Sequence, residues 1–201
     1  MNNKALLAEL IGTFGLTLAV LTSIAHPGFP VATPIMAALT LMLFVYSVGS
    51  VSGTHINPAV TIGLLVIRKI STATAVGYIA AQLIGAFLAK ALAGVILQSM
   101  PITGADGGTF MTAVFEACGD FFLVFGVVAV VLKRVPEAMS GIVIGGSLLL
   151  GISVAAAGSA GILNPAVACA IGSCSIWYIV GPLVGGVIGS IVSKALSSQN
   201  S

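Results

Sequence analysis

The residues whose types most clearly suggest a chemical role are two copies of the tripeptide Asn-Pro-Ala, each set in apolar sequence. Asparagine is a favoured helix N-cap, because its side-chain oxygen accepts hydrogen bonds from the unpaired N–H groups of the first turn. Proline suits the next position, since the helix has no use for an N–H there. Each tripeptide therefore predicts the start of a short helix. The residues are Asn57, Pro58 and Ala59 in the first copy and Asn164, Pro165 and Ala166 in the second.

A single glutamate stands 48 residues before each asparagine, Glu9 before Asn57 and Glu116 before Asn164. An ionisable side chain within apolar sequence is costly and marks a functional candidate. The equal spacing indicates a duplicated unit, so we expect one domain over residues 1–201, with repeats over about 1–100 and about 108–201.

The composition places these motifs in a membrane. Apolar residues make up 58 % of the chain and charged residues 6 %, whereas a soluble protein carries roughly a quarter charged residues. We therefore expect a lipid bilayer as partner, and the net charge of +2 gives no reason to expect nucleic acid. The cysteines are odd in number and lack metal-ligand spacing, so we expect small buried apolar residues without a disulfide, and we predict no metal or other cofactor. They are Cys118, Cys169 and Cys174.

Six apolar runs are long enough for helices that cross a membrane, which takes about 20 residues. They cover about 5–25, 34–52, 73–97, 111–132, 139–157 and 176–196. Two shorter runs begin at the tripeptides and cover about 57–67 and 164–173, a length typical of re-entrant half-helices. The predicted fold is an all-α membrane protein with six transmembrane helices, two re-entrant half-helices and an inverted internal repeat. Gly85 and Gly185 occupy matching places in the third and sixth spans, where small residues let helices pack closely.

The basic residues predict the orientation in the membrane. With the N-terminus in the cytoplasm, six of them fall on the cytoplasmic side, and the outer loops His26–Pro30, Pro101–Gly108 and Gly158–Leu163 contain none. The six are Lys4, Arg68, Lys69, Lys133, Arg134 and Lys194. Both termini are then cytoplasmic in a multi-pass protein of a bacterial-type inner (plasma) membrane, and the half-helices enter from opposite sides. Inverted half-helices that meet near the midplane are the expected sign of a solute site between the repeats.

Three segments resemble the major intrinsic proteins, the aquaporins and aquaglyceroporins. Ser52–Thr61 is similar to the family's first signature, Ala8–Phe14 to its first helix and Tyr78–Gly85 to its third. The resemblance covers essentially the whole chain. It implies a single channel domain that forms a passive channel, with one pore per chain and four chains in a homotetramer.

The resemblance also implies roles for particular residues. Asn57 and Asn164 would point amide N–H groups into the pore centre, with each amide oxygen held by its own helix cap. Glu9 and Glu116 would brace the re-entrant loops. Two rows of backbone carbonyls would accept hydrogen bonds from the solute. The first row is Gly53, Thr54 and His55, and the second is Ala160, Gly161 and Ile162.

One position departs from the family pattern. Three residues after the second asparagine, where the family usually has arginine, this chain has Val167. Ala37, Ile152 and Gly161 take the other places of the outer constriction. This ring has no cation and no side-chain donor, so it should be wider and more apolar than a water-selective filter. We therefore expect a passive channel for water and small uncharged solutes such as glycerol, urea and neutral metalloid hydroxides (arsenite as arsenous acid), with weaker exclusion of protons and cations.

Other functional classes are weighed against this one. An enzyme would need a nucleophile–base or metal constellation, which two histidines and the motifs of this chain do not provide, so no enzyme is expected. A gradient-coupled secondary transporter also uses inverted repeats and broken helices. It stays open as the alternative, because Asp120 and Lys90 add charges within the spans. Asp120 lies one helical turn after Glu116, and we expect it to hydrogen-bond a loop or to line a polar cavity. His55 is expected to offer its backbone carbonyl, with pH gating left open.

Overall fold

The computed structural model describes residues 2–26, 28–97 and 107–197. Pro27, and residues 98–106 with most of the predicted loop Pro101–Gly108 and of the boundary between the repeats, lie outside the described residues. Within the described ranges, six helical segments are long and apolar enough to cross a membrane. They are α1 (Asn3–Ala25), α2 (Thr33–Ser52), α4 (Thr72–Ile96), α5 (Phe110–Val131), η1 with α6 (Glu137–Met139 and Ser140–Ala155) and α8 (Ile176–Ala195).

Two shorter helices begin at the prolines of the Asn-Pro-Ala motifs. Helix α3 covers Pro58–Val66 and α7 covers Pro165–Ile171. The asparagine before each proline is the N-cap, with an extended backbone and a side chain that accepts from the first turn. The six predicted spans and two predicted half-helices are confirmed, and every boundary lies within two residues of its predicted place.

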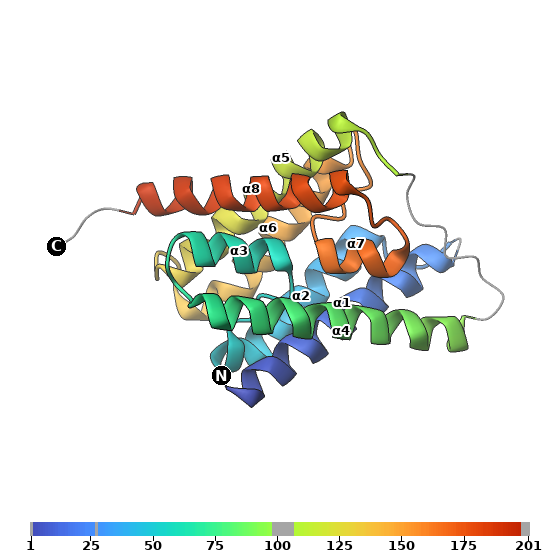
Figure 1. Cartoon of the computed structure of the whole chain (residues 1–201), viewed down its shortest axis with the longest axis horizontal. Helices are drawn as coiled ribbons and strands as arrows, with labels where there is room; N and C mark the ends of the chain where they lie inside the picture. The colour runs from blue at the N-terminus through green and yellow to red at the C-terminus, as the bar shows by residue number, and fades with distance from the viewer. Residues whose placement is uncertain (1, 27, 98–106, 198–201) are drawn as a thin grey trace.

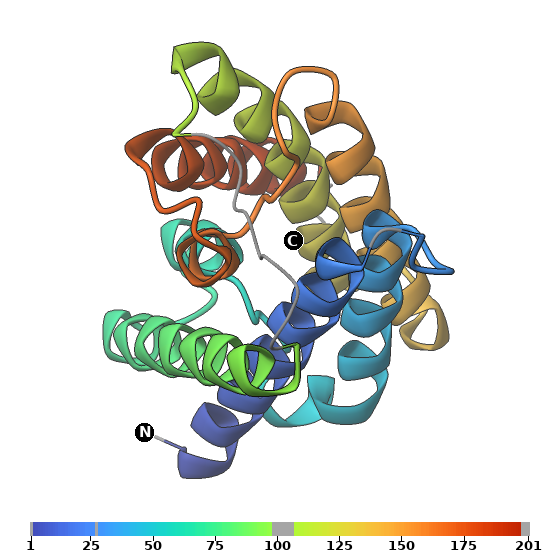
Figure 2. The same cartoon turned by 90° about the vertical axis from the view of Figure 1, so that its right-hand side faces the viewer.

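The two half-helices lie end to end between long helices. Helices α4 and α8 run along the horizontal axis of Figure 1, with both chain termini toward the left, α3 on the left and α7 on the right. Figure 2 looks along that axis and shows α7 in front of α3. Helix α3 packs mainly against α8, and α7 mainly against α4, so each half-helix is held by the long helix of the other half of the chain. We call the end with both termini the terminal end and the opposite one the far end.

Close packing of α1 on α4 and of α5 on α8 depends on glycine at matching places. A Cβ atom added at Gly85 in α4 would clash with the backbone carbonyl oxygen of Leu10 in α1. A Cβ atom added at Gly185 in α8 would clash in the same way with the carbonyl oxygen of Ala117 in α5. Neither backbone oxygen can move without moving its helix. The predicted role of these two glycines in helix packing is confirmed.

The prediction for the cysteines is wrong in two respects. Cys169 and Cys174 form a disulfide, with their Cα atoms 4.1 Å apart. Gly172 ends α7 with a left-handed backbone at φ 96°, and this reversal brings Cys174 back beside Cys169. Cys118 is exposed on the surface of α5 rather than buried, because an apolar residue of a spanning helix can face lipid as well as the core.

Candidate functional site

The two asparagines cap their own half-helices and also reach across to the opposite loop. Each side-chain oxygen accepts from the backbone N–H two positions on, at 2.8 Å for Asn57 and 3.1 Å for Asn164. The side-chain nitrogen of Asn57 donates to the Leu163 carbonyl at 2.8 Å, and that of Asn164 donates to the Ile56 carbonyl at 2.9 Å. An amide NH₂ group has two hydrogens. One hydrogen of each amide therefore ties the two loops together, and the second is left for a further acceptor.

The residue before each asparagine has a left-handed backbone, with φ 38° at Ile56 and 55° at Leu163. Branched side chains avoid this conformation, so the turn must be held from outside. The Glu9 carboxylate accepts from the N–H of Ile56 at 2.6 Å and of the residue before it at 2.9 Å. The Glu116 carboxylate accepts from the N–H of Leu163 at 2.7 Å and of the residue before it at 3.0 Å. Both glutamates are fully buried, and they hold matching turns through matching bonds.

Sequence analysis missed the serines that complete these two sites. The Ser52 hydroxyl donates to Glu9 at 2.6 Å, and the Ser159 hydroxyl donates to Glu116 at 2.8 Å. Each serine hydroxyl also accepts the backbone N–H two residues on, at 3.0 Å in both loops. A signal was present, because each serine lies five positions before its asparagine. That equal spacing would have marked both residues as members of the repeated site.

A polar network joins Glu9 to the half-helix α3. The side-chain nitrogen of Gln82 in α4 donates to Glu9 at 2.8 Å and to the hydroxyl of Thr61 in α3 at 3.0 Å. His55 Nδ1 lies 3.1 Å from the same hydroxyl, and its ring packs edge-on against Tyr78 with 5.0 Å between centroids. The His55 side chain is therefore held in place, so this residue contributes more to the site than the backbone carbonyl that was expected of it.

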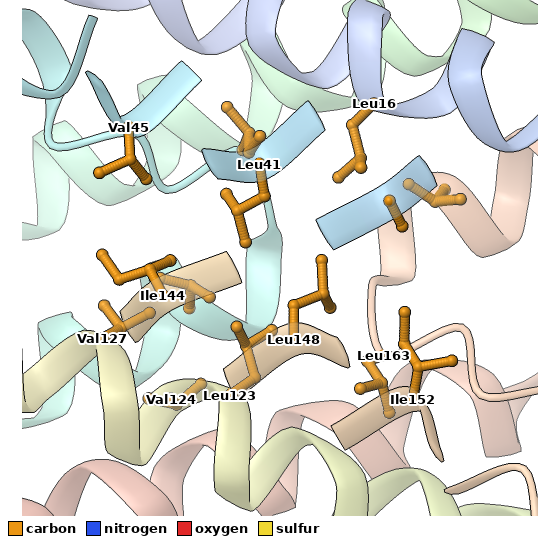
Figure 3. Close-up of a cluster of buried hydrophobic side chains, with 14 of the residues drawn as sticks. Leu16, Leu41, Val45, Leu123, Val124, Val127, Ile144, Leu148, Ile152 and Leu163 are labelled. Carbon is orange, nitrogen blue, oxygen red and sulfur yellow. The ribbon is translucent and has the colours of Figure 1, made fainter. Parts of the chain in front are cut away.

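A cavity of about 400 Å³ passes both asparagines. Its walls come from α1, α2, α5, α6, the two half-helices and the loops before them, whereas α4 and α8 stand outside. Much of the wall is apolar, and Figure 3 shows several of these side chains, which come from α1, α2, α5 and α6. They include Leu16, Leu41, Leu123, Leu148 and Ile152. None of the described residues that line the cavity is Asp, Glu, Lys or Arg.

The four residues predicted for the outer constriction all line this cavity. Ala37 comes from α2, Ile152 from α6, Gly161 from the loop before α7, and Val167 from α7. Gly161 has φ 64°, and a Cβ atom there would lie 2.9 Å from the Ile152 carbonyl oxygen, so only glycine fits. The four predicted residues therefore line the same cavity, and their role as a constriction stays a prediction.

Most residues of the two predicted carbonyl rows also line the cavity. The exception is Gly53, which ends α2 with φ 88° and lies outside the wall, while Ile56 follows the row instead. The lining residues of the two loops are Thr54, His55, Ile56, Ala160, Gly161 and Ile162.

Asp120 in α5 is fully buried, and neither carboxyl oxygen has a hydrogen-bond partner among the described residues. A Cβ atom added at Gly186 in α8 would lie 2.7 Å from Asp120 Oδ2 and 3.1 Å from the carbonyl oxygen of Ala59 in α3. Asp120 therefore sits behind the first turn of α3 and not in the cavity wall. Neither expected environment, a loop hydrogen bond or a polar cavity, is found. Lys90 is exposed on the surface of α4.

These features define a multi-pass membrane channel of the aquaporin type, and the comparisons with known proteins agree. The family described as Major intrinsic protein matches residues 1–193. The chain is 32 % identical over 212 residues to the glycerol uptake facilitator protein-like 6 of Lactiplantibacillus plantarum, covering 96 % of this chain and 98 % of that protein. It is 32 % identical over 204 residues to aquaporin NIP1-1 of Zea mays, covering 93 % of this chain and 72 % of that protein.

A solved structure carries the same fold. The X-ray structure of the aquaglyceroporin from Plasmodium falciparum is similar with a TM-score of 0.76 at 21 % identity, covering 96 % of this chain and 94 % of that one. The chain belongs to the major intrinsic protein family of aquaporin and glycerol-facilitator channels, which are not enzymes.

Proposed function

We propose that the chain is a passive channel for water and for small uncharged solutes, with glycerol, urea and neutral metalloid hydroxides such as arsenous acid as the substrate class. The observation that carries this proposal is the cavity of about 400 Å³ that passes both asparagines and meets no charged side chain among its described lining residues. Charged solutes would lose hydration there without a compensating partner. A neutral polyol needs only hydrogen bonds, which the asparagine amides and loop carbonyls can supply.

The two asparagines are the central donors in this proposal. Each amide has one hydrogen bonded to the opposite loop, at 2.8 Å for Asn57 and 2.9 Å for Asn164. That bond orients the amide, and its other hydrogen donates to a passing solute oxygen. The tripeptide residues of both copies form the pore centre, and Glu9 and Glu116 brace it through the strained turns that precede the asparagines.

The absence of the usual arginine sets the selectivity. Val167 occupies that place, and with Ala37, Ile152 and Gly161 it gives a constriction without cation or side-chain donor. Such a ring admits solutes larger than water and can close by dewetting. Cation exclusion then rests on the positive N-termini of α3 and α7 and on the central asparagines.

We further propose a homotetramer in a bacterial-type inner membrane, with both termini in the cytoplasm. Each chain is one channel domain with repeats over about 1–100 and about 108–201. The disulfide supports this orientation, since it joins α7 to the turn before α8, this connection lies at the far end (Figure 1), and disulfides persist outside the cytosol. The six cytoplasmic Lys and Arg residues argue for the same orientation independently.

A vesicle-shrinkage panel tests the proposed solute class. Purified protein in liposomes is mixed with hyperosmotic glycerol, urea or arsenous acid, and light scattering reports water efflux and then solute entry. We expect glycerol and at least one other neutral solute to re-swell these vesicles faster than protein-free ones. Proteoliposomes that pass water but exclude every larger neutral solute would rule out the proposal.

A gradient-coupled transporter is the second candidate, because Asp120 is a buried carboxyl group without a hydrogen-bond partner among the described residues. Such groups in spanning helices often serve ion coupling. The same vesicles distinguish the two functions. A transporter would show flux that saturates with solute and vanishes when an uncoupler removes the ion gradient, whereas channel flux rises linearly and needs no gradient.

A further inference from the structure

The disulfide between Cys169 and Cys174 has no part in the channel as described so far. Cys169 lies in α7, and Cys174 lies in the turn that leads to α8. Cys174 is exposed and Cys169 is half-buried. A thiol in solution can therefore reach the disulfide from the side of Cys174.

The turn after α7 does not need the disulfide in order to form. At the end of α3, Arg68 has φ 62°, and the next residue donates its N–H to the Leu64 carbonyl at 2.9 Å. At the end of α7, Gly172 has φ 96°, and the next residue donates its N–H to the Ala168 carbonyl at 2.8 Å. The same backbone turn closes both half-helices, and the first has no cysteine. The disulfide is therefore an added constraint on a turn that the backbone already makes.

The constrained segment carries part of the cavity wall. Val167 lies two residues before Cys169 and Ile171 lies two residues after it, and both line the cavity. Helix α7 has only seven residues, too few to be stable through its own hydrogen bonds. The Asn164 cap fixes its N-terminus, and the disulfide ties its last turns to the chain that follows. Breaking the disulfide removes the covalent constraint on the end of the segment that bears Val167 and leaves only the backbone hydrogen bond to the Ala168 carbonyl.

The location of the disulfide points to external thiols. It lies in the connection from α7 to α8 at the far end (Figure 1), close in sequence to Trp177, whose ring packs edge-on against Phe110 at 6.3 Å between centroids. Under the proposed orientation this end faces the outer solution, where the bond would be oxidised at rest. We propose that Cys169 and Cys174 are a redox modification site for small external thiols, and that this site sets how firmly α7 holds the outer constriction.

The reaction is thiol–disulfide exchange. A thiolate attacks the exposed Cys174 sulfur, forms a mixed disulfide with it and releases Cys169 as a thiolate, which takes up a proton. A second thiol attacks the mixed disulfide, releases the Cys174 thiol and leaves as a small disulfide. The protein gains two electrons and two protons, which the two thiols supply. With α7 less constrained, the constriction admits glycerol-sized solutes faster; this consequence rests on the proposed function.

The test uses full-length protein in liposomes, with the variant Cys118→Ser as background so that the pair carries the remaining thiols. Reduced glutathione is added outside, and a membrane-impermeant maleimide counts accessible thiols. We expect labelling of the pair only after glutathione treatment. We expect the ratio of glycerol to water permeability to rise about fivefold, the factor that 1 kcal/mol produces in an equilibrium. Reoxidation should return the ratio to its starting value.

Two comparisons separate this inference from other causes. The wild type should respond like the Cys118→Ser background, because Cys118 is exposed on α5 and outside the disulfide. Cys169→Ser with Cys174→Ser should have the permeability ratio of the reduced protein and ignore glutathione; if it fails to fold, the reduction and reoxidation cycle of the parent decides. Maleimide labelling without glutathione, or an unchanged ratio after confirmed reduction, overturns the inference. Vesicles that pass no solute in either redox state overturn the proposed channel function itself.

Discussion

Replacing Glu9 with leucine should disrupt the first half-helix far more than replacing it with glutamine. The Glu9 carboxylate accepts four hydrogen bonds, from the Ser52 hydroxyl, the backbone N–H groups of His55 and Ile56, and the side chain of Gln82. Leucine removes the acceptor of all four, and the buried N–H groups of His55 and Ile56 lose the partner that holds them, at about 1–3 kcal/mol each. These two groups alone give about 2–6 kcal/mol, a large share of the stability of a typical domain, about 5–15 kcal/mol.

Glutamine keeps the shape and one carbonyl oxygen. It can still accept about half of these bonds, so we expect roughly half of the loss. Glu116 provides an internal comparison, because its carboxylate accepts three bonds rather than four. Glu116→Leu should therefore be milder than Glu9→Leu by about 1–3 kcal/mol.

The assay heats each detergent-solubilised variant and measures the fraction that still elutes as the assembled species. A difference of 1 kcal/mol moves the midpoint by about 2–4 °C for a chain of this size. Vesicle permeability to glycerol is then measured for every variant that assembles. Equal midpoints and equal permeability for Glu9→Leu and Glu9→Gln would refute the bracing role, since only the leucine variant lacks an acceptor.

Three further predictions concern the pore centre, the constriction and the helix packing. Asn164→Asp keeps the cap oxygen but puts a carboxylate where the amide donates to a carbonyl at 2.9 Å, so glycerol flux should fall and cation leak should rise; unchanged values of both would remove the central-donor role. Val167→Arg should narrow the ring and add a donor, cutting glycerol permeability more than water permeability, and a constant ratio in vesicle shrinkage would contradict this. Gly185→Ala should force α5 and α8 apart because the methyl group clashes with the Ala117 carbonyl oxygen, at a cost of about 1–3 kcal/mol, whereas Gly94→Ala, with nothing within 4 Å, should leave the thermal midpoint the same or higher.

The sequence alone determined the number, length and ends of the helices. Apolar runs report directly on what a bilayer accepts, and the tripeptides mark helix starts through the local chemistry of caps. Both signals lie within a few residues of the feature they predict. The repeated 48-residue spacing from Glu9 to Asn57 and from Glu116 to Asn164 also associated each glutamate with one tripeptide, and each does hold the turn before its asparagine.

The tertiary structure decided which distant groups meet. The Asn57 side chain donates a hydrogen bond to the Leu163 carbonyl across 106 positions of sequence, and the Gln82 side chain donates one to Glu9 across 73 positions. No local pattern encodes such a pairing. The disulfide depended on a chain reversal at Gly172, and apolar surroundings alone could not separate bonded cysteines from a lipid-facing one. Asp120 lies behind α3 because α5, α8 and the half-helix pack together there. Hydrophobicity and capping act within one segment, whereas these contacts exist only after the two halves of the chain have closed around each other.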